Sequence, residues 1–222
     1  MRTITKRAEP ASLTRHRSTQ QADWAGYRDV ADARKALCVE QGFICAFCTN
    51  RIRPVEPVAD KDHGTKVAHW HPRKGPNGSP DLQLRWTNLL GCCPGGESGA
   101  PRHCDTAQAD ALLRIHPVLG QPSPELAIRC QRNGLLYSGD PAIQRDIDET
   151  LNLNCEKLRQ KREAVIDGAF PGLAKGKHWS VAELRARRNA WTTLDADGMF
   201  MPFSQFAVAR IDQRIARHSA KG

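Results

Sequence analysis

Cysteines spaced like metal ligands are the first chemically informative feature of this sequence. Cys45 and Cys48 form a C-x-x-C pair, a turn that points both sulfurs at one tetrahedral ion. Cys93 and Cys104, which bracket a glycine-rich loop, provide the other half of the site, and Cys92 is an alternative to its neighbour Cys93. Four converging thiolates favour zinc over calcium or magnesium, which prefer oxygen ligands. The spacing therefore predicts a structural Zn²⁺ site.

The same C-x-x-C pair has two other interpretations, a redox-active pair or two buried thiols. A redox pair normally opens a helix after a strand in a βαβ setting, and the sequence has no such setting here. Cys38, Cys130 and Cys155 fall within apolar helical or strand patterns. We interpret these three as ordinary core thiols.

Polar residues suited to hydrolysis lie between and beside the two halves of the predicted zinc site. His69 follows a short alternating segment, Asn88 precedes the second cysteine half, and Asp105 follows Cys104 directly. A neutral imidazole can accept a proton from water, and a divalent cation can stabilise charge on a phosphate. Taken singly, the three residues also fit a packed strand histidine, a turn asparagine and a helix cap. Taken together, they provide the groups that metal-assisted hydrolysis needs.

Short elements must position these residues. The apolar pattern predicts a helix within residues 24–41 that Gly42 ends, and a short strand within 66–71 that Pro72 ends. A further helix is expected to begin near Cys104 or Asp105, because Asp suits a helix start.

We expect an α+β fold in which mainly helical segments surround a small core. Residues 1–23 are predicted to be a basic N-terminal arm with little regular structure, residues 24–120 the zinc-stapled core, and residues 121–222 a mainly helical region. In this last region we expect a turn at Asn133-Gly134, followed by helical patterns at residues 141–168, 181–193 and 204–217.

The net charge of +9, from 33 lysines and arginines against 24 aspartates and glutamates, fits a polyanionic partner. A merely soluble basic protein fits this charge equally well. Arg51, Arg53, Arg73 and Lys74 lie near the predicted centre, and further basic residues such as Lys6 lie in the arm; all are candidates to contact phosphates. Such contacts carry no sequence information and do not separate DNA from RNA.

We expect a cytoplasmic protein. No apolar run approaches the roughly 20 residues that a membrane helix needs, and the first residues lack the apolar stretch of a signal peptide. Thiols stay reduced in the cytoplasm, so the 8 cysteines are better explained by metal binding than by disulfides.

The order of these features resembles the HNH (ββα-metal) nuclease motif and, more closely, the PtuB-like HNH endonucleases of Septu and retron anti-phage defence systems. The likeness is carried by segments in a common order: AEPASLTRHR, CAFCTNRIRP, AHW, RWTNLLGCCPGGE, RHCDT, LYSGDPAI and TLNLNCEKLRQKR. It implies that His69 is the general base, that Asn88 orients His69, and that Asp105 is a ligand of a catalytic Mg²⁺ or Mn²⁺ ion.

Two positions depart from the family pattern. Ala68 stands where the family usually has an acidic metal ligand, and Ala107-Gln108-Ala109 stands where it usually has a lysine and a glycine. One hypothesis is that His71 or His103 supplies a replacement ligand. The alternative is a catalytically impaired zinc module that binds nucleic acid or regulates a partner.

The resemblance also implies partners. The family's HNH proteins work with a PtuA-like ABC-type ATPase, and in retrons with a reverse transcriptase and its DNA–RNA product. The chain has no phosphate-binding loop of the Walker type, so we expect no ATP hydrolysis by the chain itself. The C-terminal helices are candidates for a docking surface, although they also fit a core.

Overall fold

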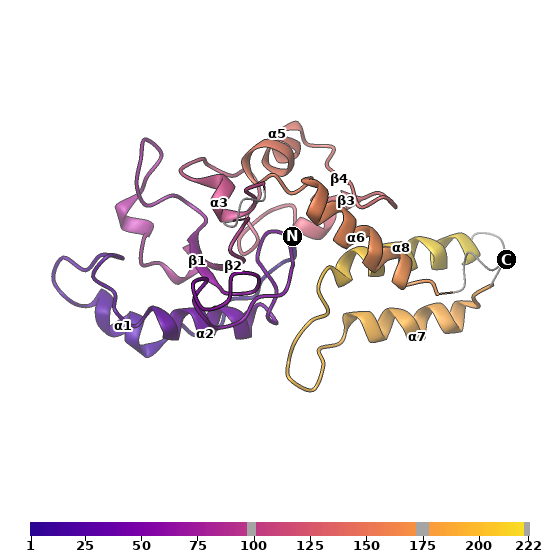
Figure 1. Ribbon diagram of the computed structural model, residues 1–222, viewed down its shortest axis with the longest axis horizontal. Coiled ribbons are helices and arrows are strands. Elements are labelled where there is room, and N and C mark those ends of the chain that lie inside the picture. The colour runs from indigo at the N-terminus through magenta and orange to yellow at the C-terminus, as the bar shows by residue number, and fades with distance from the viewer. Residues whose placement is uncertain (97–100, 172–177, 220–222) are drawn as a thin grey trace.

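The computed structural model describes residues 1–96, 101–171 and 178–219, and contains both helices and short strands (Figure 1). Part of the predicted glycine-rich loop, residues 97–100, lies outside the described residues. The helices are α1 (Ala11–Arg17), α2 (Val30–Glu40), α3 (Asp105–Gln108), α4 (Pro124–Ala127), α5 (Pro141–Arg145), α6 (Glu156–Gly168), α7 (Val181–Thr192) and α8 (Ser204–Ser219). The strands are β1 (Lys66–His69), β2 (Leu89–Cys92), β3 (Arg129–Cys130) and β4 (Leu136–Tyr137).

Strands β1 and β2 form an antiparallel pair, and the strand predicted within residues 66–71 is thereby confirmed over Lys66–His69. In this pair Ala68 lies opposite Leu90 and His69 lies opposite Leu89. Side chains alternate between the two faces of a strand. Ala68 and Leu90 therefore enter the core that contains Cys45, Cys48, Cys93 and Cys104, whereas Leu89 enters a second core beneath α1 and α2. The His69 side chain lies on the same face of the strand pair as Leu89.

Helix α2 packs on this strand pair through Ala33 and Leu37, which are fully buried. The helix was predicted to end at Gly42, and this is confirmed: Gly42 has φ +59°, a conformation that favours glycine. Any side chain there would also meet the Phe200 ring, only 2.4 Å from the position of a Cβ atom.

Helix α3 begins where the sequence predicted. Cys104 immediately precedes it and Asp105 is its first residue, although no side-chain hydrogen bond from Cys104 caps the helix. The helix is only four residues long, because Ala109 follows it with φ +51°, outside the helical region.

The N-terminal arm contains helix α1, so the prediction of little regular structure there was wrong. Leu13 is fully buried and anchors this helix, and Arg17 pairs with Glu9 at 2.5 Å. The first residues lie extended across the core, where Ile4 donates its backbone N–H to the Pro117 carbonyl at 2.8 Å. The predominantly polar composition of residues 1–23 concealed the single buried leucine that stabilises α1.

The C-terminal region contains the helices α4 to α8 and the short strands β3 and β4. The turn at Asn133-Gly134 joins β3 to β4, and Gly134 has φ +77°. A Cβ atom at this glycine would lie 2.1 Å from the Arg159 carbonyl oxygen, so the turn has no room for a side chain. The predicted helical stretch 141–168 is split into α5, a wider π-helical turn at Asp146–Thr150, and α6.

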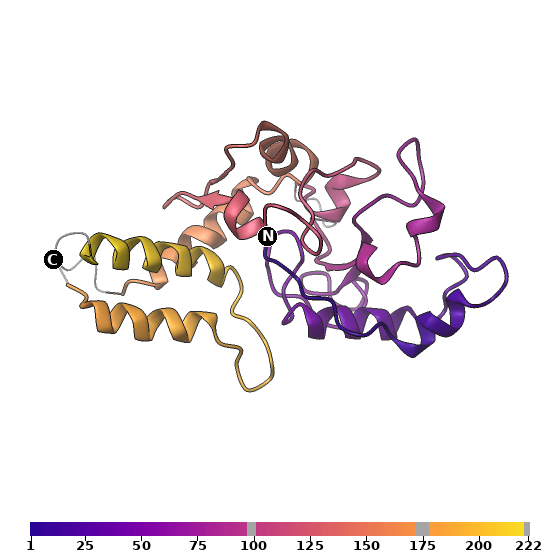
Figure 2. The same ribbon diagram turned by 180° about the vertical axis from the view of Figure 1, so that it is seen from behind.

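Helices α7 and α8 lie side by side at the end of the molecule away from α1, as both views show (Figures 1 and 2). They bury a small core of their own with the end of α6, which contains Phe170, Trp179, Leu184 and Ile211. Among the described residues, no helix is both long and apolar enough to cross a membrane.

Candidate metal centre and catalytic pocket

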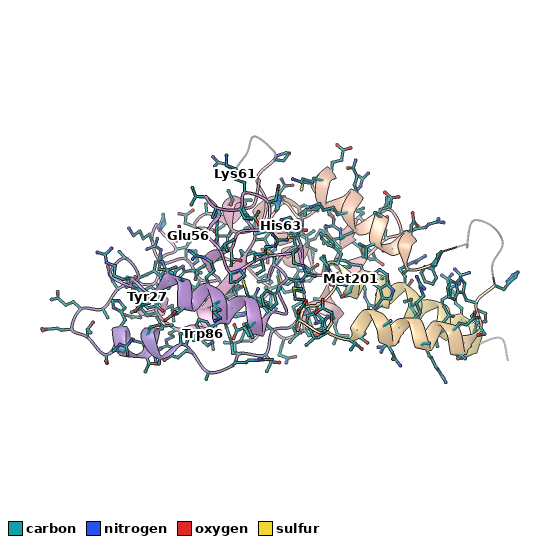
Figure 3. The ribbon with its side chains drawn as sticks, turned by 60° about the horizontal axis from the view of Figure 1, so that its bottom comes forward. Tyr27, Glu56, Lys61, His63, Trp86 and Met201 are labelled. Carbon is teal, nitrogen blue, oxygen red and sulfur yellow. The ribbon has the colours of Figure 1, made fainter. Side chains whose placement is uncertain are left out.

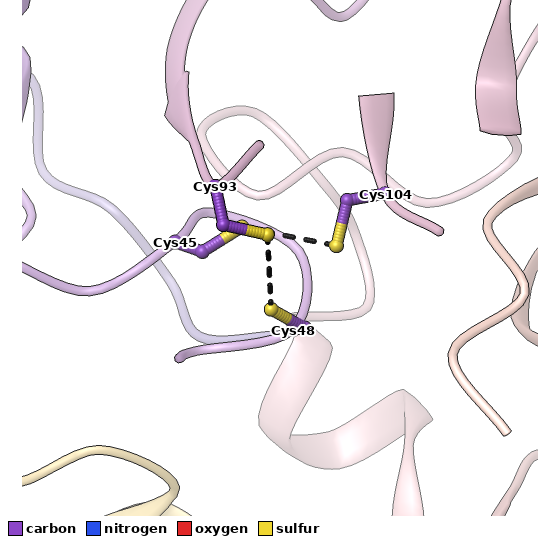
Figure 4. Close-up of side chains that lie close together, drawn as sticks. All are labelled: Cys45, Cys48, Cys93 and Cys104. Carbon is purple, nitrogen blue, oxygen red and sulfur yellow. Dashed lines mark hydrogen bonds between the residues drawn. The ribbon is translucent and has the colours of Figure 1, made fainter. Parts of the chain in front are cut away.

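Four cysteines from three separate segments of the chain converge on one buried point (Figure 4). The sulfurs of Cys45, Cys48, Cys93 and Cys104 all lie within 4.8 Å of one another. Cys45 Sγ is 3.9 Å from Cys104 Sγ, and Cys48 Sγ is 3.7 Å from Cys93 Sγ. Zn–S bonds of about 2.3 Å in a tetrahedron place neighbouring sulfurs about 3.8 Å apart. The donor set therefore fits a structural metal such as zinc.

Cys92 lies outside this group of four sulfurs, which brings Cys93 and not Cys92 to the centre. Cys92 is the last residue of β2 and is fully buried. Burial raises the pKa of its thiol well above the ordinary value, and the nearby Cys45 raises it further. Cys92 is therefore a neutral thiol beside the centre.

Without a cation, the cluster favours the thiolate at Cys45 and the neutral thiol at Cys104. Burial disfavours the Cys45 thiolate, yet hydrogen bonds from the thiols of Cys104 and Cys48 hold the Cys45 pKa well below its ordinary value. Burial and the neighbouring Cys45 in turn raise the pKa of Cys104. A divalent cation bound among the four sulfurs would favour the thiolate form of each, because it would share their negative charge.

Two cationic or polar groups lie beside the cluster. Arg162 is fully buried and donates through Nε to the Gly134 carbonyl at 2.6 Å and through Nη2 to the Leu153 carbonyl at 2.9 Å. His103 is also buried, with Nδ1 3.2 Å from Cys104 Sγ. Burial lowers the pKa of His103, which favours the neutral ring.

His69, the last residue of β1, is held in one orientation. Its Nε2 lies 3.0 Å from the Gln83 carbonyl oxygen, and the Trp24 ring meets the imidazole edge-on with a centroid distance of 4.9 Å. A carbonyl can only accept, so Nε2 carries the hydrogen and Nδ1 presents a lone pair. Within the described residues Nδ1 has no hydrogen-bond partner. Burial lowers the His69 pKa to about 4, so the ring is neutral at pH 7.

Asn88 fastens the loop that follows β1 and makes no direct hydrogen bond to the His69 ring. Its Oδ1 accepts from the His71 backbone N–H at 2.7 Å, and its Nδ2 donates to the carbonyls of His71 and Leu82, at 3.1 and 3.0 Å. Leu82 directly precedes Gln83, whose carbonyl receives His69 Nε2. Asn88 thus fixes the backbone on both sides of His69's hydrogen bond.

His69 and Asp105 line one open pocket of about 430 Å³. Arg73 and Lys74 from the loop after β1 also line it, as does Asp110, which follows α3. The pocket thus combines a neutral imidazole, two carboxylates and two cations. This is a composition suited to holding a divalent ion and a phosphate group.

Several predicted residues lie elsewhere. His71 and His103 are absent from the lining of this pocket, so the geometry gives neither a replacement-ligand role there. Ala68 is 1% exposed within the cysteine core. Arg51 donates to the carbonyls of Phe43 and Phe200, which favours a structural role, and Arg53 lies 3.6 Å from Asp60.

Sequence reasoning missed Trp24, Gln83 and Asp110 as parts of this site. Gln83 contributes only a backbone carbonyl, which leaves no sequence signal. The Asp110 carboxylate reaches the pocket beside Gly75, where a residue with a side chain would collide with it. An aspartate five residues after Asp105 was the one available signal.

Comparison with known proteins identifies a relevant relative. The chain is 28% identical to an Escherichia coli protein described as "Retron Ec83 putative HNH endonuclease", over an alignment of 173 residues. The match covers 60% of this chain and 64% of that protein, slightly less than two thirds of the relative's length. No family model matches the chain. The likeness supports a nuclease of the HNH kind.

Proposed function

We propose that the chain is a metal-dependent HNH endonuclease that hydrolyses nucleic-acid phosphodiester bonds. The observation that carries the proposal is the pocket shared by His69 and Asp105. These residues come from β1 and α3, and the four-cysteine cluster holds together the segments that lead into both elements. The order β1, β2, α3 agrees with the ββα arrangement expected of such a site.

In this proposal His69 is the general base. The Nδ1 lone pair accepts the proton of an attacking water while Nε2–H remains on the Gln83 carbonyl, so the ring does not turn. A pKa of about 4 makes the free imidazole a weak base. A bound phosphate would place negative charge nearby and favour the protonated ring, which strengthens the base when substrate is present.

Asp105 is the proposed ligand of a Mg²⁺ or Mn²⁺ ion, which would stabilise charge on the phosphate and the leaving oxygen. Asn88 is a positioning residue in this proposal: it does not contact the His69 ring, but it fixes the loop whose Gln83 carbonyl binds that ring. Arg73 and Lys74 are the proposed phosphate contacts, because both line the same pocket.

The direct test is cleavage of a panel of single- and double-stranded DNA and RNA with Mg²⁺ or Mn²⁺. We expect cleavage by the unmodified chain and a loss of at least about 100-fold in His69→Ala and Asp105→Asn. His218→Ala, which removes an exposed histidine in the last turn of α8, is the matched control and should keep full activity. Equal cleavage by His69→Ala and the control would refute His69 as the base.

A second candidate is a catalytically silent zinc module that binds nucleic acid or regulates a partner ATPase. Ala68 favours it, since a buried methyl group supplies no ligand at a position where the family usually has an acid. Binding of nucleic acid with zinc retained, but without cleavage of any substrate in the panel, is the result that selects this candidate.

The proposal extends to a role in a cytoplasmic anti-phage defence complex with a PtuA-like ABC-type ATPase, and in a retron setting with a reverse transcriptase and its DNA–RNA product. The name of the Escherichia coli relative supports the retron setting. Co-purification of the chain with a tagged PtuA-like ATPase tests it. A cleavage assay with and without that ATPase then shows whether the partner controls the nuclease.

A further inference from the structure

A second pocket, of about 240 Å³, lies beside the cysteine cluster and is rich in positive charge. Three lysines line it together with a single aspartate: Lys61, Lys157, Lys161 and Asp62. Its remaining lining includes His63, His103 and the glycines Gly95 and Gly96. Figure 3 shows Lys61 and His63 on the same side of the molecule, in the loop that precedes β1.

The two lysines on α6 repel each other, which lowers the stability of the helix. Lys157 and Lys161 are four residues apart on α6, where like charges face each other and destabilise a helix by a few tenths of a kcal/mol. Within the described residues, neither they nor Lys61 forms an ion pair or a side-chain hydrogen bond. Three ammonium groups, one from the loop before β1 and two from α6, thus converge on one pocket, and none of them has an ion-pair partner in the part of the chain that the structure describes.

This pocket adjoins the catalytic pocket through a short segment of chain. His103 lines the lysine pocket and Asp105 lines the catalytic pocket, with Cys104 between them. Two residues of chain span at most about 7 Å. A nucleic-acid strand carries a phosphate at every nucleotide, so a strand that follows this segment of the surface would place successive phosphates at both pockets.

We propose that the pocket formed by Lys61, Lys157 and Lys161 binds phosphate groups, and that their source is the backbone of the nucleic acid cleaved in the neighbouring pocket. The choice of a strand over a free nucleotide rests on the proposed nuclease function, whereas the phosphate chemistry stands on the pocket alone. The site adds affinity and orients the strand without reading its bases.

The competing explanation is that these lysines neutralise the charge of the metal–thiolate centre. Cys93 and His103 form one wall of the pocket, so the centre is close. That role predicts that removal of the lysines weakens metal retention, whereas phosphate binding predicts that metal content is unchanged.

The experiment measures binding in the full-length zinc-loaded chain carrying His69→Ala, so that the strand is not cut. The variant is Lys157→Gln/Lys161→Gln, and its matched control is Lys35→Gln/Arg185→Gln, which removes two exposed charges from α2 and α7. Fluorescence anisotropy follows a labelled 12-nucleotide strand over a range of salt concentrations, with inorganic phosphate and ATP as unlabelled competitors. Zinc content is measured in parallel.

We expect the lysine variant to lose roughly tenfold in strand affinity, and the slope of its salt dependence to fall by about 0.7 for each phosphate that is no longer neutralised. The control should lose less than about twofold and keep its salt dependence. Loss of phosphate and ATP binding with unchanged strand affinity supports the phosphate site but assigns it to a small ligand. Equal behaviour of variant and control, or loss of zinc in the variant, overturns the proposal.

This readout is separate from the test of cleavage. Lysine-dependent binding by a chain that cuts nothing would refute the nuclease and keep the phosphate site. Cleavage that is unaffected by the lysine variant, together with unchanged binding, would keep the nuclease and refute the phosphate site.

Discussion

Lys6 Nζ lies 2.6 Å from the carbonyl oxygen of Leu89, the residue that pairs with His69 across the β1–β2 ladder. The same ammonium group pairs with Glu40 at 2.5 Å and sits 4.2 Å from the centroid of the Trp86 ring. The side chains of Lys6 and Glu40 are 9% and 1% exposed. Lys6 thus ties the N-terminal arm to the strand behind His69, and this buried position does not suit the phosphate contact that the sequence suggested for it.

We predict that Lys6→Met destabilises the protein by about 3 to 5 kcal/mol, because it leaves the Glu40 carboxylate buried without its partner. Urea denaturation measures the change. Lys6→Met/Glu40→Gln should recover part of the loss, since no unpaired charge remains. A Lys6→Met variant as stable as the unmodified chain would show that the buried pair is not formed.

The low pKa of His69 makes stability depend on pH. The folded-state pKa is about 4 against 6.5 for the free residue, so between these values the unfolded chain binds the proton more readily. The His69 contribution is complete above pH 6.5 and is lost as pH falls toward 4. Between pH 7 and pH 5 the loss is on the order of 2 kcal/mol.

Denaturant titrations at pH 7 and pH 5, with zinc in the buffer, check this prediction by comparison with His69→Gln, which should show a correspondingly smaller pH dependence. His116→Gln is a useful companion, because burial also lowers the His116 pKa to about 4. An unchanged pH dependence in His69→Gln would mean that the ring is not buried in the neutral form.

The cysteine cluster predicts that each chain binds one zinc ion and that substitution of a single cysteine ligand releases it. We expect Cys48→Ser to lose zinc on dialysis and to unfold at a lower temperature, since structural zinc contributes about 10 kcal/mol or more to folded small sites. Elemental analysis and thermal denaturation measure both effects.

Cys155→Ser is the matched control for Cys48→Ser. Cys155 precedes α6 at the N-cap position and makes no capping hydrogen bond. Serine is preferred there, so this variant should retain zinc and gain about 0.5 to 1 kcal/mol of stability. Equal zinc loss in both variants would contradict the assignment of the cluster.

Ala109 has φ +51° and ψ −112°, a conformation that strains a residue with a Cβ atom. We predict that Ala109→Gly stabilises the protein by about 1 kcal/mol, measured by urea denaturation. Ala107→Gly, two residues earlier within α3, should cost about 1 kcal/mol instead. A loss of stability in Ala109→Gly like that in Ala107→Gly would exclude backbone strain at Ala109.

The nucleases that the sequence resembles usually have a glycine near this position, and the strain at Ala109 gives a physical reason for it. Other predictions from the sequence also depend on the local chemistry of a few neighbouring residues. The C-x-x-C turn fixes two sulfurs locally, Pro72 and Gly42 limit the elements around them, and the Asn-Gly turn between β3 and β4 requires no tertiary contact.

The parts that sequence reasoning missed depend on contacts between distant residues. The choice of Cys93 over Cys92 depends on how the backbone turns after β2: Cys92 ends the strand on the same face as Leu90, whereas Cys93 lies beyond the strand and brings its sulfur to the other three. Arg51 looks like a phosphate contact until Phe200, far along the chain, supplies the carbonyl that binds it. Neither composition nor periodicity reports such a partner.

The ligand spacing also governs when the proposed nuclease site can form during synthesis. Cys48 and Cys93 are 45 residues apart, and Cys45 and Cys104 are 59 residues apart. Closing such loops carries an entropic cost that only the complete ligand set repays. A ribosome-bound chain that has not yet released Cys104 therefore lacks both its metal staple and Asp105, and we expect the hydrolytic pocket to assemble late, in a single metal-triggered step.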